Sequence, residues 1–458
     1  MPRFSGRTAE RYQVHRRSLI SMEKPQLKRT LGLFALVAYG VGDTLGAGIY
    51  ALVGKIAGMV GPACWMSFAV ALLAAGFTAL SYAEMGARYP YASGEAHYTF
   101  EAFRFRIFSH AVGFLVFMSG ITSMCAVAHA FAGYLNPFIP GIPVPLVVIP
   151  FFIIIGLITL SGVENSSKTN MICTLVEVTG LVIVIFAGLS HFGQLKVDYF
   201  SFIPELEGGG KVQAVLAGAV FAFYAFIGFE DMVKASEEVK DPQKNLPRGI
   251  LLTLTITGVI YLLVAVSAVT VVTPEELGRS TAPLMTVVQK GAPWISLGFF
   301  TAIALFAVAN TALVNFMMAS RILYGMAQEG LMPHWFKAVH AKFRTPHIAT
   351  LAVFMIVIVL TLTGNLTRLA QSTAVLLLCA FFAVNVSLIR LKLVRPEAGA
   401  ASAAHFKAPL WAPVLGALTA AGLLCYASHA ALLTALGLVG LAFLLFFLTP
   451  LVNSKQKT

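Results

Sequence analysis

Twelve apolar stretches, most of them about 20 residues long, follow one another along this chain of 458 residues. A helix of that length crosses the hydrocarbon core of a bilayer and satisfies its own backbone hydrogen bonds there. Only 11% of the residues are charged and 58% are hydrophobic, which excludes an ordinary soluble domain. The sequence therefore predicts an all-α polytopic membrane protein, with spans near residues 33–58, 64–86, 111–134, 144–161, 170–190, 212–231, 250–272, 294–320, 349–363, 369–390, 411–426 and 430–448.

The basic residues predict the orientation of these spans, because cytoplasmic loops of membrane proteins are enriched in Lys and Arg. With a cytoplasmic N-terminus, all but six of the 32 Lys and Arg residues fall on the cytoplasmic side. We therefore expect a multi-pass protein of the cell inner (cytoplasmic) membrane with both termini in the cytoplasm. The net charge of +12 then reflects topology and contact with anionic membrane lipids, and gives no reason to expect a nucleic-acid partner. The six exceptions are Lys55, Lys196, Lys211, Arg279, Lys290 and Arg368.

The segments outside the spans are too short to fold as separate soluble domains. We expect a single membrane domain at residues 31–448, between a basic cytoplasmic tail at 1–30 and a short cytoplasmic tail at 449–458. The five cysteines lie in apolar stretches without the CxxC spacing of metal sites. We therefore expect them to serve in packing, and we expect no metal and no cofactor.

The first apolar stretch carries four glycines and an acidic residue in its middle, at residues 39–50 (YGVGDTLGAGIY). A straight helix through this segment would be poorly held and would bury Asp43 in the bilayer. We therefore expect the helix to unwind near Gly46 to Gly48. The second half-helix would then begin with free N–H groups at the positive end of a helix dipole, which favour a carboxylate.

The sixth apolar stretch has a similar interruption at residues 221–230 (FAFYAFIGFE). A break near Tyr224 to Ile227 would leave carbonyl groups unpaired, which suit an ammonium group or a cation. Breaks in the first and sixth spans have the spacing of two inverted five-helix repeats, at about 31–190 and 212–390, followed by extra helices at about 411–448. For either stretch taken alone, close helix packing is the simpler explanation.

Three motifs, in this order, resemble the amino acid-polyamine-organocation (APC) superfamily of permeases. They are GDTLGAGIY at 42–50, FIGFE at 226–230 followed by EEVKDPQKNLPRGI at 237–250, and SRILYGMAQEGLMP at 320–333. The first motif, together with YAEMGARYP at 82–90, looks closest to the cationic amino acid transporter-like prokaryotic members.

The resemblance implies a LeuT-type fold, with a 5+5 inverted repeat and two C-terminal helices that make twelve transmembrane helices. It also implies that an amino acid binds between the two breaks. The carboxylate of the substrate would meet the amides around Ala47, Gly48 and Ile49.

The same resemblance implies partners for the other end of the amino acid. The ammonium group would meet the carbonyl groups of Thr44, Tyr224 and Ile227. Tyr224 and Phe226 would act as aromatic lids, because their flat faces can exclude water from an occupied site.

The coupling ion is indicated by one departure from the family pattern. In proton-coupled relatives a lysine on the fifth helix can stand in for a sodium ion, and the matching position here is Glu177. A glutamate inside a membrane can carry a proton, although a permanent hydrogen bond or ion pair is the alternative role. We favour protons over sodium as the coupling ion. The other coupling candidates, several near the sodium site of sodium-coupled relatives, are Gly42, Asp43, Glu230, Asn310 and Thr311.

These observations predict a secondary active transporter that takes up neutral amino acids by alternating access, coupled to protons. A neutral substrate is favoured because residues 118–125 of the third span contain no acid. A cationic amino acid transporter and an amino acid exchanger are the alternatives, and a non-transporting sensor of the same fold is the alternative from another class. The chain lacks the HExxH, GxSxG and paired-histidine patterns of enzymes, and it shows no repeated channel filter. An auxiliary subunit and a homo-oligomer stay open.

Overall fold

The computed structural model describes residues 29, 31–91, 93–136, 138–160, 163–193, 197–203, 210–340, 345–363, 366–394 and 406–454. The tail predicted at 1–30 lies outside the described residues except for Arg29, and so do residues 455–458 of the tail predicted at 449–458.

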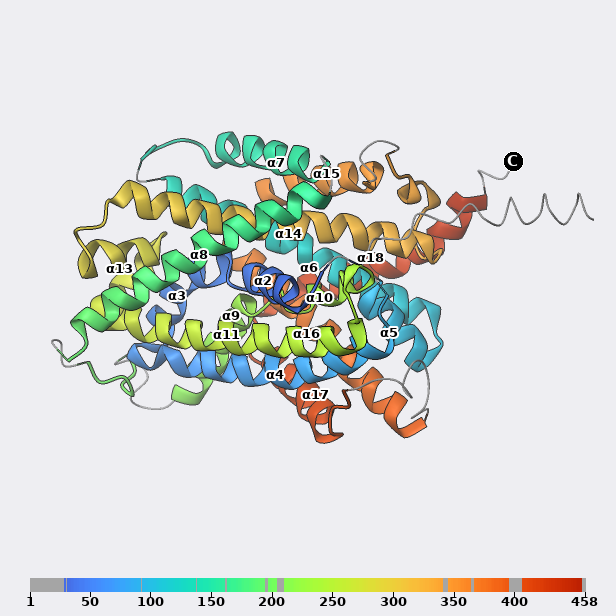
Figure 1. Cartoon of the computed structure of the whole chain (residues 1–458), viewed down its shortest axis with the longest axis horizontal. Coiled ribbons are helices and arrows are strands. Elements are labelled where there is room, and N and C mark those ends of the chain that lie inside the picture. Colours follow the sequence, from blue (N-terminus) through green and yellow to red (C-terminus); the bar gives the residue numbers. More distant parts are fainter. Residues whose placement is uncertain are drawn as a thin grey trace, which may run out of the picture.

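The described residues form helices joined by short connections (Figure 1). In the first half of the chain these are α2 (Leu33–Thr44), α3 (Ala47–Val60), α4 (Trp65–Arg88), α5 (Gly94–Phe103), α6 (Arg106–Leu135), α7 (Val144–Leu160), α8 (Val163–His191) and α9 (Lys211–Ala225). In the second half they are α10 (Asp231–Lys234), α11 (Pro242–Val271), α12 (Pro274–Arg279), α13 (Pro283–Gly291), α14 (Leu297–Gln328), α15 (His347–Thr363), α16 (Leu366–Val394), α17 (Trp411–Leu424) and α18 (His429–Ser454).

Many of these helices have the length and composition of membrane spans. Within the described part of the chain, 7 helices are long and apolar enough to cross a membrane, and α2 with α3 passes the same test as one span bent by 41°. The helices α7, α9, α15 and α17 are apolar but shorter. The prediction of an all-helical polytopic membrane protein is therefore confirmed.

Besides the four-residue helix α10, three short helices were not expected from the sequence. α5 lies between the second and third predicted spans, and α12 and α13 lie between the seventh and eighth. They are too short to stand out as apolar stretches. α12 and α13 both pack against α3, so they close one end of the bundle over the interrupted first span.

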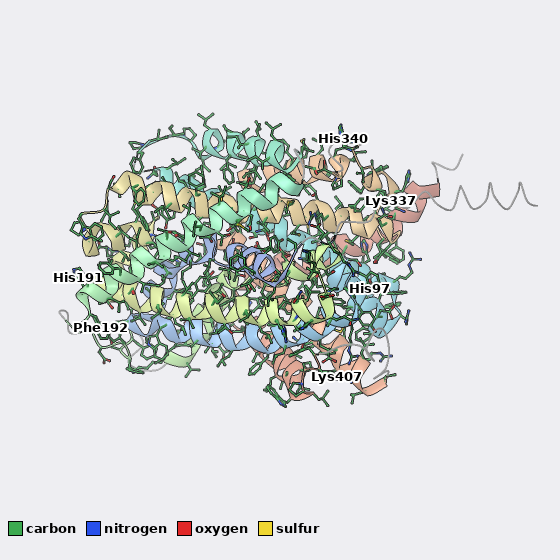
Figure 2. The ribbon with its side chains drawn as sticks, in the orientation of Figure 1. His97, His191, Phe192, Lys337, His340 and Lys407 are labelled. Carbon is green, nitrogen blue, oxygen red and sulfur yellow. The ribbon has the colours of Figure 1, made fainter. Side chains whose placement is uncertain are left out.

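The two interrupted segments lie inside the bundle. The long helices α4, α11 and α14 run along the longest axis in Figure 1, and α2 and α3 lie near its centre. α2 packs against α8 and α11, while α3 packs against α9. Figure 2 shows His97, Lys337 and Lys407 toward one end of this axis, and His191 and Phe192 at the other.

Buried polar contacts hold the surrounding helices in register. Asn385 of α16 accepts a hydrogen bond from Ser81 Oγ of α4 at 2.6 Å and donates one to Thr78 Oγ1 at 2.9 Å. Glu84 of α4 pairs with Arg88 and, at 2.6 Å, with Lys392 Nζ of α16. Since a buried polar group without its partner is costly, these contacts fix α4 against α16 beside the interrupted helices.

Candidate functional site

The first interruption separates α2 from α3 at Leu45 and Gly46. It begins slightly earlier than the predicted break near Gly46 to Gly48. The amide of Ala47, the first residue of α3, donates to Thr311 Oγ1 of α14 at 2.9 Å. The next amides, of Gly48 and Ile49, belong to the helical turn in which no intrahelical carbonyl is within reach. The positive end of α3 therefore faces the interior of the bundle.

The second interruption separates α9, which ends at Ala225, from α10, which begins at Asp231. It begins slightly later than the predicted break near Tyr224 to Ile227. Gly228 lies in it with φ +131°, a conformation that side chains disfavour. A Cβ at Gly228 would lie 2.9 Å from the carbonyl carbon of Asp43, so the two interruptions touch at this point.

A tyrosine of α11 joins the two interrupted helices. The hydroxyl of Tyr261 lies within hydrogen-bonding distance of the carbonyl oxygen of Thr44, at the end of α2, and of the carbonyl oxygen of Ala225, at the end of α9, the latter at 2.8 Å. Tyr261 is fully buried. Its hydroxyl therefore holds the negative ends of both half-helices close together.

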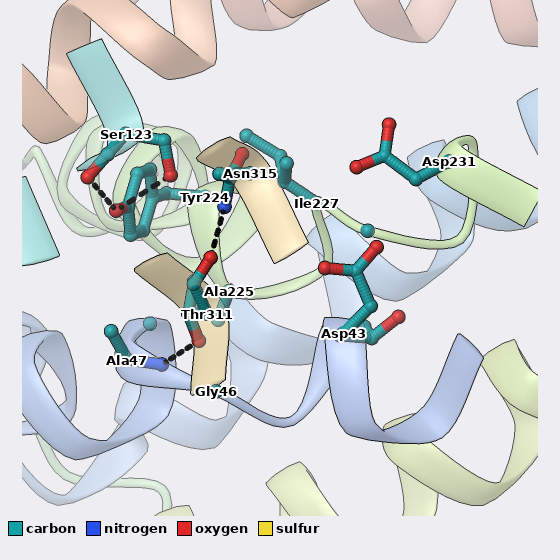
Figure 3. Close-up of a pocket in the computed structure, with 13 residues that line it drawn as sticks. Asp43, Gly46, Ala47, Ser123, Tyr224, Ala225, Ile227, Asp231, Thr311 and Asn315 are labelled. Atoms are coloured by element: carbon teal, nitrogen blue, oxygen red, sulfur yellow. Dashed lines mark hydrogen bonds between the residues drawn. The ribbon is translucent and has the colours of Figure 1, made fainter. Parts of the chain in front are cut away.

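A cavity lies between the two interruptions (Figure 3). Its volume of about 10 Å³ suffices for about one water molecule. The hydroxyls of Tyr224 and Ser123 lie 3.2 Å apart on one side of it, and Thr311 and Asn315 of α14 border it. The residues that line it are Asp43, Thr44, Gly46, Ala47, Gly48, Ser123, Tyr224, Ala225, Ile227, Gly228, Asp231, Thr311 and Asn315.

Most of the binding residues expected from the sequence meet in this cavity. Its lining includes Thr44, Ala47, Gly48, Tyr224 and Ile227, as well as the coupling candidates Asp43 and Thr311. The expected residues outside the lining are Gly42, Ile49, Glu177, Phe226, Glu230 and Asn310.

Phe226 and Ile49 have surroundings different from those of the other expected binding residues. The ring of Phe226 packs against the ring of Tyr261 with centroids 5.0 Å apart. The side chain of Ile49 is fully buried in the hydrophobic core. Of the two aromatic residues expected to act as lids, only Tyr224 therefore lines the cavity.

A second polar group lies behind the first interruption, where α2, α8 and α14 meet. Asn310 Nδ2 lies 3.2 Å from the carbonyl oxygen of Gly42 and 3.4 Å from Glu177 Oε2. Asn310 Oδ1 accepts a hydrogen bond from Asn170 at 3.2 Å. Glu177 is fully buried, and its Oε1 has no hydrogen-bond partner among the described residues. Asn310 therefore links two other coupling candidates, Gly42 and Glu177.

The structure adds polar residues that sequence reasoning missed. Asp231 borders the cavity, and its carboxylate pairs with Lys234 on the same short helix. The orientation prediction places Lys234 in a cytoplasmic loop, whereas its side chain is only 4% exposed. The spacing of three residues between Asp231 and Lys234 was the available signal. Glu230, the expected coupling residue beside them, accepts the amide hydrogen of Gly228 at 2.8 Å.

An all-helical membrane protein whose interrupted helices surround a polar cavity has the features of a membrane transporter. Comparison with known families agrees with this class. The profile of the amino acid permease family matches residues 31–458, so the chain belongs to this family of the APC superfamily.

Relatives of known function are similar over most of the chain. The branched-chain amino acid permease BcaP of Bacillus subtilis is 29% identical over 392 residues, which cover 81% of this chain and 82% of the relative. The vacuolar cationic amino acid transporter 4 of Arabidopsis thaliana is 30% identical over 407 residues, 84% of this chain and 67% of the relative. The human cationic amino acid transporter 4 is 30% identical over 401 residues, 82% of this chain but only 62% of the relative.

Proposed function

We propose that this protein is a secondary active transporter that moves amino acids across the cytoplasmic membrane by alternating access. The observation that carries the proposal is the cavity lined by both interrupted helices. Amino acid transport also agrees with the names of the relatives. We further propose twelve spans in a LeuT-type 5+5 arrangement with both termini cytoplasmic, which the bent first span and the interrupted α9–α10 segment support.

The two ends of an amino acid have opposite charges, and the cavity offers a partner for each. The substrate carboxylate binds the amides of Gly48 and Ile49 at the positive end of α3. The ammonium group binds carbonyl oxygens at the ends of α2 and α9, those of Thr44, Tyr224 and Ile227. Since the cavity has room for about one water molecule, the helices around it move apart to admit a substrate.

Neutral amino acids are the first choice of substrate. The branched-chain permease supports this choice, as does the absence of acidic residues from 118–125 of α6. Cationic amino acids are the second choice, supported by the relatives named cationic amino acid transporters and by the carboxyl groups of Asp43 and Asp231 in the cavity.

The coupling ion in this proposal is a proton carried by Glu177. This glutamate is buried, and the only described hydrogen-bond donor to its carboxyl group is the side-chain amide of Asn310, which also donates to the carbonyl oxygen of Gly42 beside the first interruption. A change in the charge of Glu177 would therefore alter the hydrogen bonds of Asn310, and through Asn310 it would affect α2 at Gly42.

The test is a binding screen of the twenty amino acids on the purified full-length protein, followed by uptake into proteoliposomes. Imposed proton and sodium gradients are applied separately. We expect saturable uptake of at least one amino acid that a proton gradient accelerates. Binding without any flux would indicate a sensor, and stimulation by sodium alone would contradict proton coupling.

The tyrosine lid is tested by two substitutions at one position. Tyr224→Ala removes the ring that borders the cavity, and we expect substrate affinity to fall about tenfold or more, since the loss of about 1.4 kcal/mol of contact with an aromatic ring weakens binding tenfold. Tyr224→Phe keeps the ring and loses only the contact with Ser123, so its affinity should stay within about threefold. Equal losses for both variants, measured by calorimetry, would show that the hydroxyl and not the ring matters.

A further inference from the structure

A second cavity continues from the first toward one end of the molecule. It shares Ile227, Asp231 and Asn315 with the first cavity. Its other lining residues include Ser119 of α6 and Ile322 of α14. Ser119 lies nearer than Ser123 to the start of α6, which packs against α5, and Ile322 lies nearer than Asn315 to the end of α14, which packs against residues His334–Lys337. Figure 2 shows His97 and Lys337 toward the same end of the molecule, which the proposed topology makes the cytoplasmic end. The two cavities therefore follow one another along the route between the interrupted helices and the cytoplasm.

An ion pair lies at the junction of these cavities. Asp231 lines both, and Lys234 lines the second. The ammonium group of Lys234 pairs with the Asp231 carboxylate and lies 3.9 Å from Glu95 Oε1 of α5. Glu95 in turn accepts a hydrogen bond from the hydroxyl of Tyr82 at 3.1 Å. All four side chains are buried, so this is a charged group held inside the bundle.

A third carboxyl group connects this ion pair to the first cavity. Asp43 is 3% exposed, and its Oδ2 has no hydrogen-bond partner among the described residues. Asp43 and Asp231 both border the first cavity, and Figure 3 shows their carboxyl groups on the same side of it, beyond Ile227. A buried carboxyl oxygen without a donor is costly, and it offers a place for an ammonium group between the first cavity and Asp231.

We propose that Asp231 and Lys234 form a second binding station for the amino-acid head group, on the cytoplasmic side of the interrupted helices. Lys234 receives the α-carboxylate, and Asp231 receives the α-ammonium group that passes Asp43. This inference rests on the proposed transport function. It adds a binding site between the interrupted helices and the cytoplasm.

The charge balance of this station favours zwitterions over anions. When an amino-acid head group inserts into the ion pair, the carboxylate of the substrate replaces Asp231 as the partner of Lys234. The ammonium group of the substrate replaces Lys234 as the partner of Asp231. Each charge keeps a partner, so the large cost of an unpaired buried charge is avoided. A simple anion would take Lys234 from Asp231 and leave that buried carboxylate without its partner, whereas the head group of an amino acid also supplies an ammonium group to Asp231.

The test compares the two faces of the membrane. Uptake of tritiated L-leucine and L-arginine is measured in right-side-out and inside-out vesicles that contain the full-length protein. For Lys234→Met, we expect the KM for substrate entering from the cytoplasmic face to rise about tenfold or more, as for loss of a charge-assisted hydrogen bond. The KM from the opposite face should stay within about twofold of the wild-type value. Lys234→Arg keeps the charge and should restore the cytoplasmic KM.

The matched control is Lys290→Met, which removes an exposed lysine that pairs with Glu276 outside the route; it should leave both KM values unchanged. Equal changes in KM on both faces for Lys234→Met, or no change on either, would overturn the proposal. Failure of the proposed transport function is recognised separately, because the wild-type protein would then transport neither amino acid.

A second measurement uses the wild-type protein and does not depend on how the variants fold. Cryo-electron microscopy of an inward-open state with saturating L-leucine or L-arginine should show the carboxylate of the substrate within hydrogen-bonding distance of Lys234 Nζ in a fraction of particles. Density for the head group confined to the interrupted helices would contradict the second station.

Discussion

Gly48→Ala is expected to reduce amino-acid affinity by roughly 10-fold to 100-fold, in line with the cost of overpacking a tightly packed site. A Cβ at Gly48 would lie 2.5 Å from the Cα of Ala225, well inside van der Waals contact. The added methyl group must therefore push the positive end of α3 away from the end of α9. Because the substrate is proposed to bridge these two ends, a fixed displacement of one from the other weakens its contacts with both.

The control for Gly48→Ala is the same substitution at a glycine with open space. A methyl group added at Gly325 of α14 would have no neighbouring heavy atom within 4 Å, so Gly325→Ala should bind with wild-type affinity. Calorimetric titration of both variants measures the difference, and their melting temperatures report on folding. Unchanged affinity in a folded Gly48→Ala protein would refute the placement of the substrate at the end of α3.

Glu177→Gln should make uptake independent of pH while leaving substrate binding within about threefold of wild type. Glutamine fills the same space and can still accept a hydrogen bond from Asn310, but it cannot release or take up a proton. The pH profile of uptake in proteoliposomes measures the effect. Where the wild-type rate changes across the range from pH 5 to pH 8, the rate of the variant should be flat.

Two further variants distinguish a role of Glu177 in proton transfer from a purely structural role. Glu177→Asp keeps a carboxyl group and should keep a pH-dependent rate, even if that rate is lower. Glu276→Gln removes an exposed carboxylate of α12 and should leave the profile unchanged. A pH profile of Glu177→Gln that matches the wild type would assign Glu177 a permanent structural hydrogen bond.

The interruptions of the first and sixth spans could be predicted because their cause is local. Glycines and acids in the middle of an apolar stretch leave the helix poorly held whatever surrounds it. The exact limits could not be predicted in this way. α3 begins at Ala47 because Thr311, far away in sequence, accepts its first amide hydrogen, and α9 continues through Tyr224 before the turn at Gly228.

The position of Lys234 shows where sequence reasoning fails. A lysine after an apolar stretch ordinarily marks the cytoplasmic end of a span. Here it stays inside because Asp231 and Glu95 neutralise it, and Glu95 comes from α5, a short helix that the apolar pattern did not reveal. The surroundings of Phe226 likewise depend on Tyr261 of α11. The contacts of Lys234 with Glu95 and of Phe226 with Tyr261 join residues that are distant in sequence.

The hydroxyl of Tyr261 lies between two carbonyl oxygens, those of Thr44 and Ala225, but it carries a single hydrogen. At any instant it can donate fully to only one of them, so the other has an unused lone pair facing the junction of the two half-helices. Rotation of this hydroxyl about its C–O bond decides which of the two carbonyl oxygens accepts the hydrogen. In the proposed site, the carbonyl oxygen of Thr44 is therefore free to accept from the ammonium group of the substrate whenever Tyr261 donates to Ala225, and no bond of the protein has to break first.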